Sequence, residues 1–81
     1  MSITIPEPTR LDVRDTEPKN RFEAIMGAYD ALAPGAALEL VVDHDPRCMY
    51  YTLEATRPED SFSFDYLESG PEVWRVVVGR R

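Results

Sequence analysis

The sequence predicts an α/β (α+β) fold, a two-layer sandwich in which two helices cover one face of a four-stranded mixed sheet. Three observations lead to this prediction. The apolar spacing changes between a period of two and a period near 3.6, in the order strand, helix, strand, helix, strand, strand. The connecting segments are short and contain Pro, Gly and Asp. The 81 residues suffice for one domain with one core.

The first strand is expected over residues 10–14. Leu11 and Val13 share one face, and three charged side chains share the other. The preceding residues 1–9 contain two prolines and few apolar side chains, which indicates a flexible N-terminal arm. We therefore expect an arm over residues 1–9 and a single domain over residues 10–81.

A helix is expected next, with Pro18 in its first turn and Ala33-Pro34-Gly35 at its end. Gly27 lies in the middle of this helix, where glycine costs about 1 kcal/mol relative to alanine. This cost predicts that another element approaches the helix closely at Gly27. The apolar stripe of the helix consists of Phe22, Ile25, Met26, Tyr29 and Leu32.

The nearly continuous apolar run Ala37–Val42 predicts an inner strand. With the strand and helix before it, this run forms a βαβ unit whose two strands are parallel. The turn Asp43-His44-Asp45-Pro46 follows. Asp45 is a suitable N-cap, and Pro46 is a suitable first residue for a second helix that runs to about Thr56.

Two further strands are expected to pair as an antiparallel hairpin. Phe62, Phe64 and Tyr66 alternate with polar residues, Ser69-Gly70-Pro71 forms a turn, and Val73–Val78 completes the sheet. The other face of the sheet carries mixed charges and a few apolar side chains, which fits either cross-strand ion pairs or a partner surface. The predicted core comprises Leu11, Val13, Phe22, Ile25, Met26, Tyr29, Leu38, Leu40, Val42, Tyr50, Leu53, Phe62, Phe64, Trp74, Val76 and Val78.

The composition excludes several classes of function. Nine basic against fifteen acidic residues give a net charge of −6, which argues against nucleic-acid binding and against binding to anionic membranes. A single cysteine cannot form a disulfide within the chain. Because no signal peptide or apolar span is recognisable, we expect a cytoplasmic protein.

The turn at residues 43–46 is the first candidate site. It contains the only histidine, and it follows a strand at the end where α/β sheets tend to place their sites. Asp43 or Asp45 could orient the His44 ring. His44 is a structural turn residue, a contact to a partner or small ligand, or a metal, haem or acid–base group, and its sequence neighbours do not decide between these roles.

Cys48 is the candidate thiol. The start of a helix and the neighbouring Arg47 favour the reactive thiolate, whereas Asp43 and Asp45 oppose it. A small buried hydrophobic residue is the alternative. Tyr51 could stack on a planar ligand, and Arg14 and Arg47 could hold an anion near the helix starts or form surface ion pairs.

Three motifs in order carry a family resemblance: Asp43 to Pro46, the pair Tyr50-Tyr51, and the run from Gly70 to Arg75. With them the chain resembles a bacterial domain family of unknown function. The element order, with Leu11-Asp12-Val13-Arg14 before a loop and helix, resembles the TusA/SirA-type sulfur carriers, to which that family is related. The resemblance implies a TusA-like fold and a context of hemerythrin-like, metal or nitrogen-oxide-related proteins.

The sulfur-carrier activity itself is not implied. TusA-type carriers hold a persulfide on a Cys-Pro at the start of the first helix, where this chain reads Thr16-Glu17-Pro18-Lys19. We therefore expect a small non-enzymatic binding or adaptor module of unknown specificity that serves a redox or metal-centre system. Its cofactor is unknown, and the sequence requires none. Its partner would be a protein, bound at residues 43–51, or a second copy, bound through the open sheet face. The alternatives are a thiol or sulfur-transfer protein that uses Cys48 and a metal- or haem-binding protein that uses His44.

Overall fold

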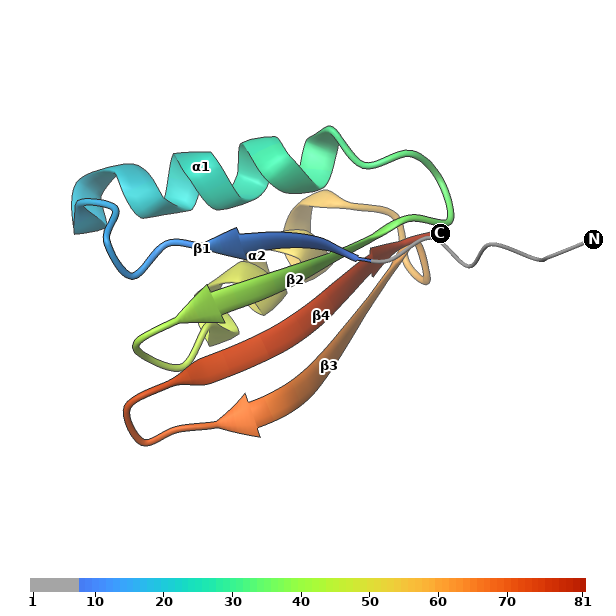
Figure 1. Ribbon diagram of the computed structural model, residues 1–81. Helices are drawn as coiled ribbons and strands as arrows, with labels where there is room; N and C mark the ends of the chain where they lie inside the picture. Colours follow the sequence, from blue (N-terminus) through green and yellow to red (C-terminus); the bar gives the residue numbers. More distant parts are fainter. Residues whose placement is uncertain (1–7) are drawn as a thin grey trace, which may run out of the picture.

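The four strands form one mixed sheet in the computed structural model, which describes residues 8–81 (Figure 1). Their order is β1-β2-β4-β3. β1 and β2 are parallel, and β4 is antiparallel to both β2 and β3. The elements in chain order are β1 (Thr9–Asp12), α1 (Pro18–Asp30), β2 (Ala37–Val42), α2 (Arg47–Thr56), β3 (Phe62–Ser69) and β4 (Trp74–Arg80). The predicted βαβαββ architecture is confirmed.

Both helices pack on the same face of the sheet. The side chains of α1 and α2 share one core with alternate residues of the two central strands, and these strand residues all point to one side because side chains alternate along a strand. The helices therefore form one layer and the sheet the other (Figure 1). The shared core contains Ile25, Tyr29, Met49 and Leu53 from the helices and Leu38, Leu40, Val42, Val76 and Val78 from the strands.

The element boundaries differ slightly from the predicted ones. β1 ends at Asp12 rather than Arg14, because the Asp12 carboxylate accepts a hydrogen bond from the Arg14 backbone amide and turns the chain. β1 also begins at Thr9, inside the predicted arm; residues 1–7 of that arm lie outside the described residues. Within residues 8–81, neither helix has the length and apolar character that crossing a membrane requires.

Two residues of the predicted core are exposed. Phe22 is 51% exposed and Tyr50 is 37% exposed. Phe22 lies in the first turns of α1, beside a hollow between the helix starts. Tyr50 lies on the side of α2 that faces β3, where its ring contacts Phe62 and Phe64 edge-on. The predicted core omitted three hydrophobic residues that belong to the buried core: Leu32, Val41 and Met49.

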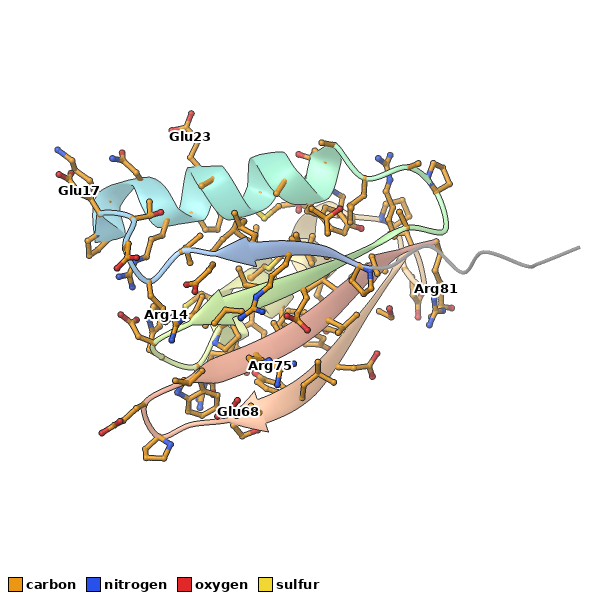
Figure 2. The ribbon with its side chains drawn as sticks, viewed as in Figure 1. Arg14, Glu17, Glu23, Glu68, Arg75 and Arg81 are labelled. Carbon is orange, nitrogen blue, oxygen red and sulfur yellow. The ribbon has the colours of Figure 1, made fainter. Side chains whose placement is uncertain are left out.

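The sheet face without helices is covered by cross-strand ion pairs, the simpler of the two predicted alternatives. Glu39 lies 3.6 Å from Arg10 and 3.1 Å from Arg75, and Arg75 lies 3.8 Å from Glu68. Figure 2 shows Glu68 and Arg75 side by side on this face. Val41 is almost completely buried on the same face, between its strand partners Asp12 and Arg75.

Two glycines have opposite surroundings. Gly27 is exposed, and a Cβ placed there would meet no atom within 4 Å, so the predicted close approach at Gly27 is wrong. Gly70 has a φ of +73°, and its Cβ would lie 2.7 Å from the Trp74 ring. Only glycine combines that backbone conformation with the space Trp74 occupies. Gly70 thus fixes the turn between β3 and β4.

Candidate functional site

Arg21 organises the turn that follows β2. Its side chain, only 13% exposed, donates to both carboxylate oxygens of Asp43, at 2.8 and 3.2 Å. It also donates to the backbone carbonyls of Thr16 and Arg14. One guanidinium therefore ties the start of α1 to the loop before it and to the turn after β2. A forked arginine suits this task because its donors lie in one plane with fixed spacing.

The His44 ring is held by the same carboxylate. Its Nδ1 lies 2.9 Å from Asp43 Oδ1, and 67% of the side chain is exposed. The hydrogen bond from His44 and those from Arg21 lower the pKa of Asp43 to about 2. Asp43 is therefore ionised at neutral pH and can only accept, so Nδ1 carries a proton. The prediction that a neighbouring aspartate orients this ring is confirmed for Asp43.

Asp45 joins the start of α2 to β3. Its carboxylate accepts hydrogen bonds from the backbone amide and the guanidinium of Arg47 and from the Tyr66 hydroxyl, which lies 2.6 Å away. Because Tyr66 and Arg47 donate to it, the pKa of Asp45 is lowered. Partial burial and the hydrogen bond to Asp45 raise the pKa of Tyr66 to about 12. The helix itself begins at Arg47, one residue later than predicted, with Pro46 at the cap position.

A hollow of about 250 Å³ opens between the starts of α1 and α2, and we call it the turn pocket. Its walls are mainly apolar, and His44, Asp45 and Cys48 lie at one side of it. Cys48 is an exposed free thiol, so the alternative that it is a small buried residue is wrong. The full lining is Pro18, Arg21, Phe22, Ile25, Val42, His44, Asp45, Pro46, Cys48 and Met49.

A second hollow, of about 290 Å³, lies between α2 and β3, and we call it the aromatic groove. It is lined by Asp45, Arg47, Tyr50, Tyr51, Phe64 and Tyr66. Tyr51 is 59% exposed and contacts the Tyr50 ring edge-on. Asp45 lines both hollows, which places it in the wall between them.

The predicted site residues thus fall into separate places. Asp43, His44 and Cys48 belong with the turn pocket, whereas Arg47 and Tyr51 line the aromatic groove. The guanidinium of Arg14 binds Asp12 at 2.6 Å and lowers the pKa of Asp12 to about 2, so it is engaged in an ion pair. Only its backbone carbonyl joins the turn network.

Three residues of the site were not predicted from the sequence: Arg21, which binds Asp43, Phe22, which lines the turn pocket, and Tyr66, which donates to Asp45. Arg21 gave one usable signal, since it directly precedes the apolar stripe of α1 and falls in its first turns. Tyr66 gave none, because its contact with Asp45 joins residues 21 positions apart.

The described residues offer limited means of binding a metal. Within residues 8–81, no group of three or more His, Cys, Asp and Glu side chains is placed to hold a metal ion. The turn pocket, at about 250 Å³, is also just below the roughly 300–1,000 Å³ of typical small-molecule sites.

Comparison with known proteins identifies one family. A profile for the family described as "Uncharacterized conserved protein (DUF2249)" matches residues 10–80, which include both helices, the turn and nearly all of the four strands. No curated protein and no solved structure matches the chain. The description of the family names no activity.

Proposed function

The chain belongs to the DUF2249 family, and we propose that it acts as a small non-enzymatic binding module that engages a protein partner at the turn pocket. The observation that carries this proposal is the position of Phe22. A large apolar side chain that is 51% exposed lines an apolar hollow in a protein with a net charge of −6. Exposed apolar surface with a charged rim is typical of interaction sites.

The surroundings of the pocket support a preformed recognition site. Arg21 and Asp43 fix the rim, and Asp43 holds the His44 ring at its edge. An inserted apolar side chain gains about 1.5–3 kcal/mol from burial, and a rim that is already ordered loses little entropy when the partner binds. His44 can then contact the partner through its Nε2. The net charge of −6 supports a protein with a basic surface as the partner, rather than nucleic acid.

The biological setting rests on the family resemblance. We propose that the family shares its origin with the TusA/SirA-type sulfur carriers and that the partner belongs to a redox or metal-centre system in the cytoplasm. The βαβαββ order of elements along the chain supports this relation. A homodimer through the open face ranks behind a protein partner, because it would have to desolvate the ion pairs of Arg10, Glu39 and Arg75.

The test uses affinity purification with matched variants. We expect Phe22→Asp to lose proteins that the wild type retains, whereas Glu23→Gln, on the adjacent exposed position, keeps them. A recovered partner should also slow the alkylation of Cys48, which lines the pocket and is the only thiol. A partner that binds Phe22→Asp as tightly as the wild type and leaves the alkylation rate unchanged would place the binding surface elsewhere.

The exposure of Cys48 at the start of α2 favours a second function, thiol or sulfur transfer. Native mass spectrometry of protein purified without reductant or chelator tests it. A sulfur adduct that disappears in Cys48→Ser would support a carrier. Metal or haem binding is a third candidate, because Asp43 holds the His44 ring by a hydrogen bond. In that case the same spectrum would show a metal or haem adduct that is lost in His44→Ala. If the spectrum shows only the unmodified chain at its calculated mass, both alternatives are contradicted and the binding module remains the proposed function.

A further inference from the structure

The outer strand β3 presents a backbone edge. Among the described strands it pairs only with β4, and it spans eight residues. From Asp65 to Ser69 all of its residues are exposed. Figure 1 shows the strand at the border of the sheet, at the end opposite β1. The backbone groups on its outer side are those to which an added strand would hydrogen-bond.

The chain segment that contains this edge is acidic, although Arg57 and Arg81 line a hollow beside Phe62 and Phe64. Residues 58–72 contain five carboxylates and no lysine, arginine or histidine. Of these five carboxylates, all within the described part of the chain, only that of Glu68 has a salt-bridge partner, Arg75 at 3.8 Å. The acidic residues are Glu59, Asp60, Asp65, Glu68 and Glu72. A segment that binds here gains from carrying positive charge, and that gain is screened by salt.

The two sides of the edge differ in chemistry. Asp65 lies opposite Val77 on the open face of the sheet, whereas Phe64 and Tyr66 point to the helix side. There they continue the aromatic groove with Tyr50, whose ring centroid lies 5.4 Å from that of Phe64. Tyr66 remains 44% exposed. An added strand would therefore meet the Asp65 carboxylate with one set of alternate side chains and aromatic rings with the other.

A second copy of the same edge fits poorly. Pairing β3 with β3 of another molecule would bring Asp65 and Glu68 of one copy close to the same carboxylates of the other. The register also shifts between Tyr66 and Glu68, where a bulge interrupts the strand. Bulges and charges on outer strands oppose unspecific pairing. The regular stretch open to a partner is therefore Phe62–Tyr66.

We propose that β3 is a docking edge for an extended basic segment of a partner protein. The segment adds as a fifth strand beside Phe62–Tyr66. Its basic side chains face Asp65, and its alternate apolar side chains face the aromatic groove. This surface is separate from the turn pocket, apart from the shared wall formed by Asp45.

The test uses a fluorescein-labelled heptapeptide, Lys-Val-Arg-Val-Lys-Val-Arg, and fluorescence anisotropy at low salt. We expect binding to the wild type and at least a tenfold weaker affinity for Asp65→Lys. Glu23→Lys is the matched control, since it changes the charge equally on α1, from which its side chain projects away from the sheet (Figure 2). It should weaken binding less than twofold.

Backbone pairing is tested with the same peptide N-methylated at alternate residues, in both registers. One register removes the donors that face β3 and should abolish binding, although the charge is unchanged. Amides within Phe62–Tyr66 should exchange more slowly when the unmodified peptide is bound. The proposal is overturned if both methylated peptides bind like the parent, if Glu23→Lys weakens binding as much as Asp65→Lys, or if the peptide does not bind at millimolar concentration.

Discussion

At the scale of single residues, Arg21 has the largest role in shaping the turn. It donates to an aspartate side chain and to two backbone carbonyls, and it is itself mostly buried. The sequence pointed to Asp43, His44 and Asp45, since they surround the only histidine. It could not point to their partner, because arginines in the first turns of helices commonly face water. Arg21 contacts Asp43 because packing places the turn after β2 beside the start of α1.

Replacing Arg21 with methionine should therefore loosen the turn. We expect a loss of about 1–2 kcal/mol in the free energy of unfolding, because two backbone carbonyls lose their donor. The pKa of Asp43 should rise part of the way to its usual value, with the hydrogen bond from His44 still lowering it. Denaturant unfolding and carboxyl NMR titration measure the two effects. Lys19→Met, at an exposed position, should change neither.

Gly27 and Gly70 allow opposite predictions from the same substitution. Gly27→Ala should stabilise the protein by about 0.5–1 kcal/mol, because the helix gains propensity and the new methyl group meets no atom. Gly70→Ala should destabilise it, since the methyl group would meet the Trp74 ring in a left-handed backbone conformation. Thermal and denaturant unfolding of both variants provide the comparison. A loss of stability in Gly27→Ala would mean that another element does approach this helix.

At the scale of elements, α2 is held at its start by a side chain of β3. The hydroxyl of Tyr66 donates to Asp45, which also accepts from the backbone and side chain of Arg47. The periodicity of the sequence predicted both elements, but it did not predict that Tyr50 faces the outer strand. A helix with apolar residues on adjacent positions leaves open which of them faces the centre of the sheet. Packing of Met49 and Leu53 into the core decided this.

Tyr66→Phe should remove the hydrogen bond between β3 and the start of α2 while keeping the aromatic ring in place. We expect a loss of about 1 kcal/mol at neutral pH, the typical contribution of one hydrogen bond. The raised pKa of about 12 adds a second signature. Because the folded state holds the phenol neutral, this contribution is present below about pH 10 and is lost as the pH rises towards 12.

Ultraviolet titration identifies Tyr66 by difference between the wild type and Tyr66→Phe. In Asp45→Asn the pKa of Tyr66 should fall towards its usual value, because the negative charge of the acceptor is gone. An unchanged titration in Asp45→Asn would mean that partial burial alone raises this pKa.

At the scale of the whole molecule, the sequence predicted the sheet, its two parallel strands, its hairpin and the common face of both helices. These follow from periodicity and connection length, which are properties of contiguous segments. The site was predicted only in part. His44 and Cys48 do line one pocket, but Arg47 and Tyr51 line another, and Arg14 binds Asp12 instead. Which side chains share a hollow depends on how α1, α2 and β3 are placed relative to one another. The periodicity of a single segment contains no information on that placement.

Acid should weaken the fold through Asp12 and Asp43, in addition to Asp45, whose pKa is also lowered. The hydrogen bonds from Arg14 lower the pKa of Asp12 to about 2, and those from His44 and Arg21 do the same for Asp43. Both groups have an ordinary pKa of 3.8, so their contribution is present above about pH 4 and is lost as the pH falls to about 2. Denaturant unfolding as a function of pH measures this slope. The double variant Asp12→Asn, Asp43→Asn should show a flatter slope than the wild type.

The strand order β1-β2-β4-β3 has a consequence for synthesis on the ribosome. β4 is the last of the described strands to emerge, yet it lies between β2 and β3 and pairs with both. Until residue 80 has been made, β2 keeps one side unpaired, and its apolar side chains lack the neighbours that β4 supplies. Until β4 has been synthesised, the nascent chain therefore exposes an apolar, aggregation-prone strand. Chaperones that bind short apolar segments should contact Ala37–Val42 during this interval and release it once the sheet closes.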